Sequence, residues 1–475
     1  MIQYFRSERF CSVTMAMRAS KKQLTSEEIF RTMTVPQAVR TMAVPAVISQ
    51  LIVLIYNLAD TFFIGQTNNP YMVAGVSLIL PMFNVCLAIG SMFGTGGGAL
   101  LPKLLAVGDR EEGSRAAAFC LRLGLLTAVG FSVLILAFMQ PLLLLLGAGP
   151  NTYSYARTYV LLVLVVGGIP TIVSNVFSNL LRSLSLSREA GIGVALGGVL
   201  NVFLDPLFMF VLLPRGNEVL GVGIATLLSN VVSCLYCLTV FCRRQKEIPV
   251  AFFAPAPTPE NRTFIFTVGF PGTVGALLFD IDYMVLDKLA AGYGDTALAA
   301  IGIVLKAERF PQQVGIGLCQ SMVPLVSYSW ALKDYKRTKE IMACILKVGL
   351  AVAVVSITLY ELFPAQIVRF FIAEPETLEI GTNFLRIRSL AAVIMFFCFF
   401  VVFLFQGFGN GKVSFWLAVI RWAVLNIPML FILPRFLGMY GLVWSQFVSD
   451  LLTVVISYFY LWRYMKTWEQ DTAAR

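Results

Sequence analysis

The sequence of 475 residues contains no histidine, and only 13% of its residues are charged. Without histidine the chain cannot build a His-ligated metal site, a Ser-His-Asp triad or a histidine proton relay. Soluble domains carry about 25% charged and roughly 45–50% apolar residues, whereas this chain is 58% hydrophobic with a mean hydropathy of +0.80. The composition excludes a disordered chain, a nucleic-acid-binding module and a secreted disulfide scaffold. It predicts a polytopic membrane protein.

Twelve apolar runs are long enough to cross a bilayer, which requires about 20 predominantly apolar residues. They cover residues 40–65, 72–101, 117–139, 154–181, 190–213, 219–241, 264–289, 296–328, 338–362, 381–406, 413–433 and 440–463. The connections are short, and none is long enough to form a soluble domain. The sequence therefore predicts an all-α protein with twelve transmembrane helices.

Lysine and arginine are unevenly distributed over the two sides of these spans. The N-terminal segment, the loops after each even-numbered span and the C-terminal tail hold 24 of them, and the other loops hold five. Because cytoplasmic loops carry the excess of positive charge, both termini are predicted to be cytoplasmic in a multi-pass protein of the cell (inner or plasma) membrane. The net charge of +10 is then a topology signal, and we expect no nucleic-acid partner.

A mixed polar stretch precedes the first span, so we expect no cleavable signal peptide. Residues 18–40 are predicted to form a cytoplasmic lead-in helix that lies against the membrane.

The two halves of the chain repeat each other at an offset of about 225 residues. Residues 74–109 match residues 299–334 without a gap, with identities such as Gly90/Gly315 and Asp109/Asp334. Each half has six spans, so both enter the membrane in the same orientation and a pseudo-two-fold axis along the membrane normal relates them. Such repeats place a substrate site between the halves and permit alternating access. The predicted units are a cytoplasmic N-terminal segment (1–39), two six-helix lobes (40–241 and 263–463), a cytoplasmic linker (242–262) and a cytoplasmic tail (464–475).

Four polar residues lie at similar depth in the first lobe. Asp60 is near the end of span one, and Thr226 begins span six. Asn201 and Asp205 are four residues apart on one face of span five. Ionisable groups inside a span are costly unless they are paired or face water. Two carboxylates, an amide and a hydroxyl suit either a bound Na⁺ or a proton shared between the carboxylates. The alternative is a hydrogen-bond network that only holds helices together.

The second lobe is more charged than the first. Its spans seven and eight carry six ionisable residues: Asp280, Asp282, Asp287, Lys306, Glu308 and Arg309. These groups either form structural salt bridges, or Asp280 or Asp282 exchanges a pairing with Lys306 or Arg309 when substrate or ion binds. Arg421 in span eleven is expected to face a central cleft.

The segment Gly94-Thr-Gly-Gly-Gly98 is superficially similar to a phosphate-binding loop. It lacks the Lys-Ser/Thr pair of such loops and lies within span two, so we interpret it as a place where helices pack closely.

Three separated motifs give the chain a resemblance to a known family. They are Tyr56-Asn-Leu-Ala-Asp-Thr-Phe-Phe-Ile-Gly65, Leu200-Asn-Val-Phe-Leu-Asp-Pro206 and the segment from Gly315 to Tyr328. In these motifs the chain resembles the MATE (multidrug and toxic compound extrusion) transporters, closest to their bacterial MepA-like members, and the match runs in order over residues 35–465. The resemblance implies two six-helix lobes around a V-shaped central cleft. It also implies export of cationic, amphipathic compounds in exchange for Na⁺ or H⁺.

The resemblance further implies which residues handle the ion. The family positions on spans one, five and six are matched by Asp60, Asn201, Asp205 and Thr226. A family asparagine on span four corresponds to Asn175 or Asn179. Asp280 is similar to an acid that a group of relatives carries on span seven, whereas the cluster Lys306–Arg309 is not general to the family.

The sequence thus predicts a multidrug efflux antiporter that works by alternating access as a monomer. No catalytic residue and no cofactor are expected, and no metal beyond a possible Na⁺ at Asp60, Asn201, Asp205 and Thr226. The alternative is a flippase for lipid-linked precursors of the same broad superfamily. A flippase needs a basic central cavity, to which Lys306, Arg309 and Arg421 would contribute.

Overall fold

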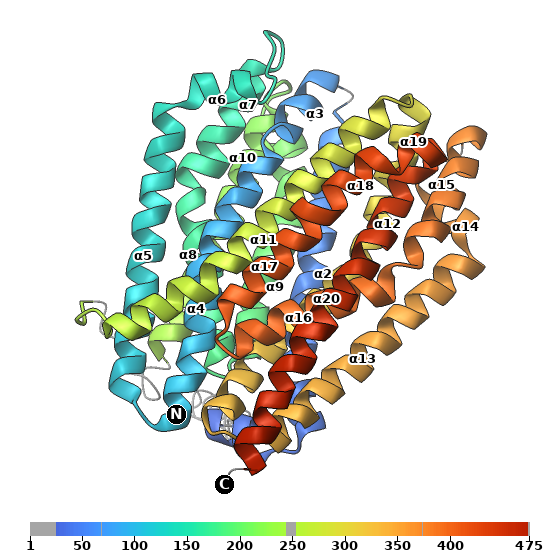
Figure 1. Cartoon of the computed structure of the whole chain (residues 1–475). Coiled ribbons are helices and arrows are strands. Elements are labelled where there is room, and N and C mark those ends of the chain that lie inside the picture. The colour runs from blue at the N-terminus through green and yellow to red at the C-terminus, as the bar shows by residue number, and fades with distance from the viewer. Residues whose placement is uncertain (1–24, 68, 244–252, 373, 474–475) are drawn as a thin grey trace, which may run out of the picture.

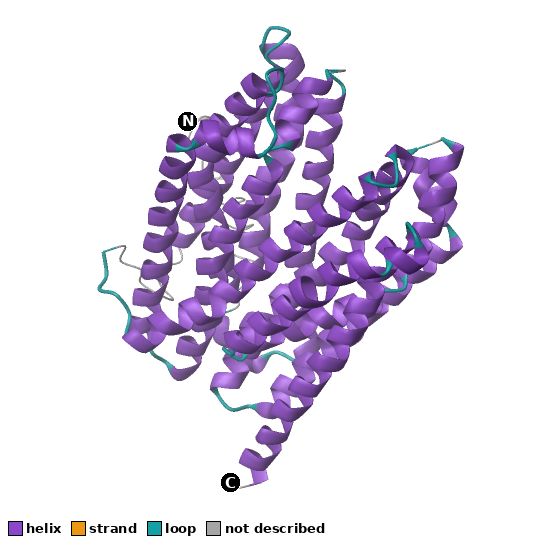
Figure 2. Cartoon of the chain, turned by 45° about the horizontal axis from the view of Figure 1, so that its top comes forward, coloured by secondary structure: helices purple, strands orange, loops and turns teal. Residues whose placement is uncertain are grey.

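The computed structural model describes residues 25–67, 69–243, 253–372 and 374–473, and all regular secondary structure in these ranges is helical (Figures 1 and 2). Labels with η denote π-helical segments. The N-terminal half contains η1 (Glu28–Thr32), α2 (Val35–Gly65), α3 (Pro70–Ser77), α4 (Leu80–Val107), α5 (Arg110–Ala137), α6 (Met139–Leu145), α7 (Tyr153–Val160), η2 (Leu161–Val166), α8 (Gly168–Ser183), α9 (Ser187–Pro206), η3 (Leu207–Leu212) and α10 (Glu218–Arg243). The C-terminal half contains α11 (Pro259–Ala291), α12 (Asp295–Ala331), α13 (Tyr335–Leu362), α14 (Pro364–Phe371), α15 (Pro375–Ser389), α16 (Ala392–Gly407), α17 (Gly411–Val419), η4 (Ile420–Asn426), α18 (Ile427–Ile432), α19 (Pro434–Leu437) and α20 (Tyr440–Ala473).

Each predicted span coincides with one helix or with a run of consecutive helices. In the part of the chain that the structure describes, nine helical rods are long and apolar enough to cross a membrane, and eleven if each of two bent pairs counts as one span. The bent pairs are Tyr153–Val166 with Gly168–Ser183 and Pro375–Ser389 with Ala392–Gly407. The remaining predicted span, span eight, corresponds to α12, which carries the charged cluster Lys306–Arg309 and contacts helices of both halves. Ionisable residues within a span usually face the interior of a helix bundle or a water-filled cavity.

Irregular turns lie next to the buried polar residues. Span four bends by 43° between η2 and α8. In span five, η3 begins directly after Pro206, which follows Asp205, and in span eleven η4 contains both Arg421 and Asn426. Proline lacks a backbone N–H and so interrupts the regular ladder, and π-turns often accompany functional positions.

The predicted lead-in helix over residues 18–40 is divided in the structure. Residues 18–24 lie outside the described residues. Helical structure covers η1, but Met33 is extended with ψ 149°, and α2 begins at Val35. The break agrees with Pro36 in the first turn of α2, because proline has no N–H to continue a helix from η1 and its ring would clash with the carbonyl of Thr32, four residues earlier. Span one therefore begins about five residues earlier than predicted.

The two halves of the chain form two lobes of helices. In the first lobe α8 packs against α4, α5 and α10, and α9 packs against α2 and α10. In the second lobe α12 packs against α13, α15 and α16, while α20 packs against α16 and η4. The lobes meet through the pairs α4 with α11 and α2 with α12. At these pairs the backbones approach closely: a Cβ on Gly317 would lie 2.8 Å from Val47 Cα, and Thr273 Oγ1 donates to Ala88 O at 3.0 Å.

Both ends of the described chain lie at the same end of the bundle, which we call the terminal face (Figure 1). Here η1 contacts both lobes. Ser26 Oγ donates to Leu184 O of the first lobe at 3.0 Å, and Arg337 Nε of the second lobe donates to Phe30 O at 2.8 Å. The terminal face is therefore closed by contacts that bridge the lobes.

Candidate functional site

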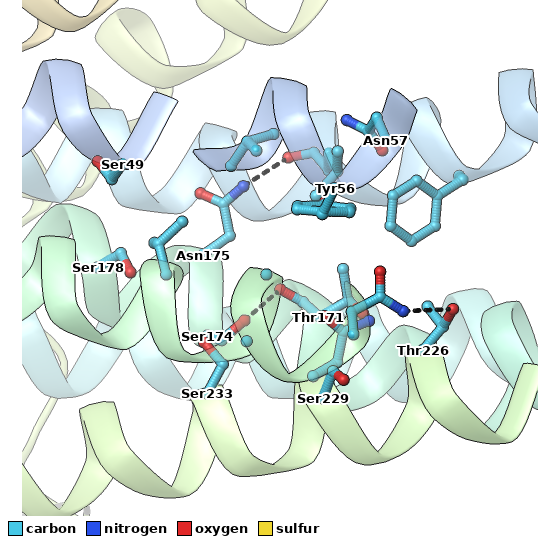
Figure 3. Close-up of a pocket in the computed structure, with 18 of the residues that line it drawn as sticks. Ser49, Tyr56, Asn57, Thr171, Ser174, Asn175, Ser178, Thr226, Ser229 and Ser233 are labelled. Atoms are coloured by element: carbon cyan, nitrogen blue, oxygen red, sulfur yellow. Dashed lines mark hydrogen bonds between the residues drawn. The ribbon is translucent and has the colours of Figure 1, made fainter. Parts of the chain in front are cut away.

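A cavity of about 270 Å³ lies inside the first lobe, between α2, α4, α8, α9 and α10. Figure 3 shows hydroxyl and amide side chains from α2, α8 and α10 around it. Gln320 of α12 also lines the cavity, so it reaches the boundary with the second lobe. Its lining includes five residues named from the sequence: Asp60, Asn175, Asn179, Asn201 and Thr226.

The structure brings the four predicted ion-site residues together. Asn201 Nδ2 donates to Asp205 Oδ1 at 3.3 Å and to Thr226 Oγ1 at 3.4 Å. The carboxyl groups of Asp60 and Asp205 lie within hydrogen-bonding reach of each other. Asp205 is completely buried, and Asn201 and Thr226 are buried as well. The helices α2, α9 and α10 thus supply one compact cluster.

Three buried oxygens of this cluster accept no hydrogen bond from the described residues: Asp60 Oδ1, Asn201 Oδ1 and Asp205 Oδ2. Nor does a lysine or arginine in the described part of the chain form an ion pair with Asp60 or Asp205. Two carboxylates at this separation repel each other unless a proton or a cation lies between them. Carboxylate, amide and hydroxyl oxygens are also the ligands that a hard cation such as Na⁺ requires. The residues present therefore fit either Na⁺ or a shared proton.

Two tyrosines that sequence reasoning missed border the cluster. Tyr159 of α7 is buried beside Thr226, and Tyr56 lies one turn before Asp60 on α2. Both line the cavity. A tyrosine near the end of a span is typical of the membrane interface, so Tyr159 gives no distinct signal. Tyr56 could have been found, because it opens the first motif and shares a helix face with Asp60.

Asn175 and Asn179, between which the sequence left the choice open, both point into the cavity system. Asn179 Nδ2 donates to Asn175 Oδ1 at 2.8 Å. Asn175 Nδ2 in turn donates to Leu87 O at 3.3 Å and to Ser91 Oγ at 3.4 Å. The pair therefore ties α8 to α4 along the cavity wall.

Asp282 belongs to a different network from the one predicted. Asn426 Nδ2 donates to Asp282 Oδ2 at 2.7 Å and to Gln446 Oε1 at 3.4 Å. Gln446 Nε2 donates to Asp450 Oδ2 at 2.8 Å, and Arg421 Nε donates to Asp450 Oδ1 at 2.7 Å. These five residues are all at most 2% exposed. The prediction that Arg421 faces a central cleft is wrong, because its guanidinium is enclosed within the second lobe.

The other charged residues of spans seven and eight separate into different environments. Glu308 Oε2 accepts from Arg388 Nε at 2.7 Å inside the second lobe. Lys306 and Asp287 are exposed.

Asp280 Oδ1 accepts from Asn84 Nδ2 of the first lobe at 3.0 Å, and the Arg309 guanidinium lies 5.9 Å from the centre of the Tyr283 ring. The predicted pairing of Asp280 or Asp282 with Lys306 or Arg309 does not occur as a salt bridge among the described residues.

The internal repeat could have pointed to the buried polar residues of the second lobe that the sequence analysis did not bring together. The segments Leu-Pro214-Arg215 and Leu-Pro434-Arg435 align spans five and six with spans eleven and twelve at an offset of 220. This register pairs three polar residues of the first lobe with three buried ones of the second: Asn201 with Arg421, Thr226 with Gln446, and the partly buried Asn230 with Asp450.

Comparison with known proteins gives the family of this arrangement. The MatE family pattern matches residues 45–207 and 271–432, one segment in each lobe. The multidrug export protein MepA of Staphylococcus saprophyticus is 27% identical over 403 residues, which cover 85% of this chain and 88% of that protein. MepA of Staphylococcus haemolyticus is 25% identical over 430 residues, covering 90% and 94%.

Solved structures share the fold. A MATE transporter in complex with MaD3S superposes with a TM-score of 0.88 at 21% identity, covering 94% of this chain and all of that one. A MOP superfamily transporter from Pyrococcus furiosus superposes with a TM-score of 0.87 at 22% identity and the same coverage. The match to both halves of the family pattern and the shared twelve-helix fold place the chain in the MatE family of multi-pass membrane transporters, among its MepA-like members.

Proposed function

We propose that the protein is an antiporter that exports cationic, amphipathic compounds in exchange for Na⁺ or H⁺. The observation that carries the proposal is the convergence of Asp60, Asn201 and Asp205, which leaves three buried oxygens without a donor. Buried acceptors of this kind are costly when they are unpaired. A cation or a proton bound at these oxygens would remove that cost. The export of drugs is taken from the relatives named as multidrug export proteins.

In the proposed cycle the ion binds when the terminal face is closed. Asp60 is on α2, whereas Asn201 and Asp205 are on α9. An ion held between these carboxylates removes their repulsion and draws α2 toward α9. Because α2 is also a helix that packs against α12 of the second lobe, a change in its position is transmitted to the contact between the lobes. Compound is released on the outer side, and the ion-loaded protein reopens toward the cytoplasm.

The remaining elements of the proposal follow from the same arrangement. The terminal face is assigned to the cytoplasm of a cell-membrane protein, because it holds most of the loop lysines and arginines. The proposed units are the ones predicted from the sequence: an N-terminal segment (1–39), two lobes (40–241 and 263–463), the linker between them (242–262) and a tail (464–475). One chain contains both lobes, which supports a monomer.

The flippase alternative receives no support from the basic residues proposed for it. Arg421 is neutralised by Asp450 inside the second lobe, whereas Lys306 is exposed and Arg309 is partly exposed. None of the three lines the cavity of the first lobe.

The test is dye efflux from proteoliposomes with Na⁺ and pH gradients imposed separately. We expect one gradient to drive efflux in the wild type and Asp205→Asn to reduce this rate at least tenfold. The matched control is Asp295→Asn, which neutralises an exposed acid at the start of α12 and should leave the rate unchanged. Wild-type efflux in Asp205→Asn would overturn the site assignment. Absence of efflux under both gradients, in folded protein, would overturn the antiport.

A further inference from the structure

Arg182 is a buried cation without a carboxylate partner. It lies in the last turn of α8 and is 7% exposed. Its Nη2 donates to Ser49 Oγ at 3.3 Å, and its Nε–H has no acceptor among the described residues. The other buried guanidiniums behave differently, since Arg388 and Arg421 each have a carboxylate oxygen at 2.7 Å.

An unpaired buried charge is costly, and two weak effects do not remove that cost. The C-terminal end of α8 favours a nearby cation, but only weakly. A single hydroxyl acceptor adds a modest hydrogen bond. A buried ion normally needs a counter-charge with good geometry. The positive charge of Arg182 is therefore not compensated by the described residues, and a bound anion would compensate it.

Two cavities meet at this guanidinium. Arg182 lines the 270 Å³ cavity of the first lobe and also a smaller one of about 30 Å³. A volume of roughly 10–15 Å³ is sufficient for one water molecule, so the smaller cavity has room for one small ion. Its walls come from both lobes: Gly94, Thr95, Gly98, Asn179 and Ser183 from the first, and Gln320, Val323, Pro324 and Phe403 from the second.

The glycine-rich segment of α4 makes this space possible. A Cβ on Gly94 would lie 2.7 Å from Asn179 Nδ2, so a larger residue would displace the cavity wall. The sequence offered only a packing role for this segment. Thr95 within it brings a hydroxyl to the cavity, and Gln320 brings a side-chain amide whose oxygen already accepts from Gln50 Nε2 at 2.9 Å.

We propose that Arg182, Thr95 and Gln320 form a site for a small anion at the boundary between the lobes. Chloride is the free ion of the right size, and a carboxylate of a transported compound is a second source of the same chemistry. Because Gln320 belongs to the second lobe, the anion binds best when the lobes are packed together at this point. For this consequence the inference rests on the proposed alternating access, in which the anion favours the state with the terminal face closed.

The internal repeat supplies a matched substitution. Helices α8 and α16 have equal length and end at corresponding residues, Ser183 and Gly407, and the next positive-φ residues are Ser185 and Gly409. This register places Gln406 where the first lobe has Arg182. Gln406 is 2% exposed, so a buried glutamine is accommodated at this point of the fold. Arg182→Gln therefore removes the charge with a side chain that the repeat already uses.

The experiment measures binding of radiolabelled chloride to the purified full-length protein by scintillation proximity, without any gradient or dye. Saturable binding in the wild type, displaced by bromide and much less by methanesulfonate, is expected. Arg182→Gln should weaken it at least tenfold, and Arg157→Gln, which removes an exposed arginine, should leave it unchanged. If Arg182→Gln does not fold, Thr95→Val replaces it and should weaken binding several-fold.

A second arm identifies the source of the anion. Binding of tetramethylrhodamine, which has a free carboxylate, is compared with binding of its methyl ester. Loss of affinity in Arg182→Gln for the acid alone assigns the site to the carboxylate of a compound. Equal chloride and dye binding in wild type and variants, or no saturable binding of either anion in the wild type, overturns the proposal. Chloride binding in a protein without efflux would refute the antiport and leave the anion site standing.

Discussion

Both lobes bury acidic residues among apolar helices, but they differ in whether a cation neutralises those acids. The second lobe has its own cation: Arg421 holds Asp450 through two hydrogen bonds at 2.7 and 3.1 Å. In the first lobe the position that corresponds to Arg421 is Asn201, a neutral residue. The acids there keep unpaired oxygens and border a cavity of about 270 Å³. The second lobe thus pairs Glu308 and Asp450 with its own guanidiniums, whereas Asp60 and Asp205 of the first lobe have no cationic partner among the described residues.

This difference teaches how a duplicated scaffold can divide its tasks. The guanidinium of Arg421 also lies 4.5 Å from the Phe399 ring centre and 4.3 Å from that of Trp422, so aromatic faces add to its stabilisation. A lobe closed in this way is suited to move as a rigid body. A lobe with an incomplete site is suited to respond to ions.

The largest effect is expected from giving the first lobe the cation of the second. In Asn201→Arg the guanidinium can pair with Asp205 one turn away and occupy the space of the coupling ion. We expect ion-driven efflux to fall to background while the protein still folds, as judged by size-exclusion chromatography and helical circular dichroism. The conservative variant Asn201→Gln keeps the amide and should retain part of the activity. Full coupled transport in Asn201→Arg would show that the ion binds elsewhere.

The next effect concerns stability and has opposite signs in the two lobes. Asp450→Asn leaves Arg421 buried without a counter-charge, which should destabilise the protein by about 3–5 kcal/mol. Asp205→Asn removes a buried charge that has no cation, so stability should be unchanged or higher. Thermal unfolding in detergent measures both. The double variant Arg421→Met with Asp450→Leu should recover most of the loss. Equal destabilisation by Asp450→Asn and Asp205→Asn would contradict the contrast between the lobes.

The fold was largely predictable, because an uninterrupted apolar run of span length has few alternatives in a membrane protein. The first-lobe cluster was predictable for the converse reason, since Asp60 and Asp205 stand out within such runs. The second-lobe pairings were not. Asp282 meets Asn426, 144 residues later, and Glu308 meets Arg388, 80 residues later. Which side chains meet depends on the rotation of each helix.

Arg182 shows a different limit of sequence reasoning. In the sequence it counts as one more positive loop residue at the end of span four. Only the structure reveals that it lies inside, at 7% exposure, because α8 continues to Ser183 and the residues just before η1 cover the following turn through the hydrogen bond from Ser26 to Leu184. The end of the lead-in segment was likewise misplaced, since a single proline, Pro36, interrupts the helix before α2 and changes the composition of the segment little.

A smaller effect tests whether the two lobes are joined outside their main interface. Glu112 at the start of α5 accepts from Thr258 N at 2.6 Å and from Asn261 Nδ2 at 2.8 Å, both at the start of α11. In Glu112→Ala the two donors lose their partner, and we expect a loss of about 1–3 kcal/mol in thermal unfolding. Glu112→Gln keeps one acceptor oxygen and should lose less. No change in either variant would mean that the lobes are held together without this contact.

The smallest effect gives the baseline against which the buried pairs are judged. Arg31 and Glu27 form an ion pair at 3.3 Å in which the side chains are 63% and 65% exposed. Exposed pairs four residues apart on a helix contribute only about 0.3–0.5 kcal/mol. Glu27→Gln should therefore shift the melting temperature by less than the error of a single measurement, whereas Asp450→Asn should shift it clearly under the same conditions. A large effect of Glu27→Gln would show that this exposed pair stabilises the fold as much as a buried one. Stability would then depend on salt and less on the burial of Phe30, which is completely buried.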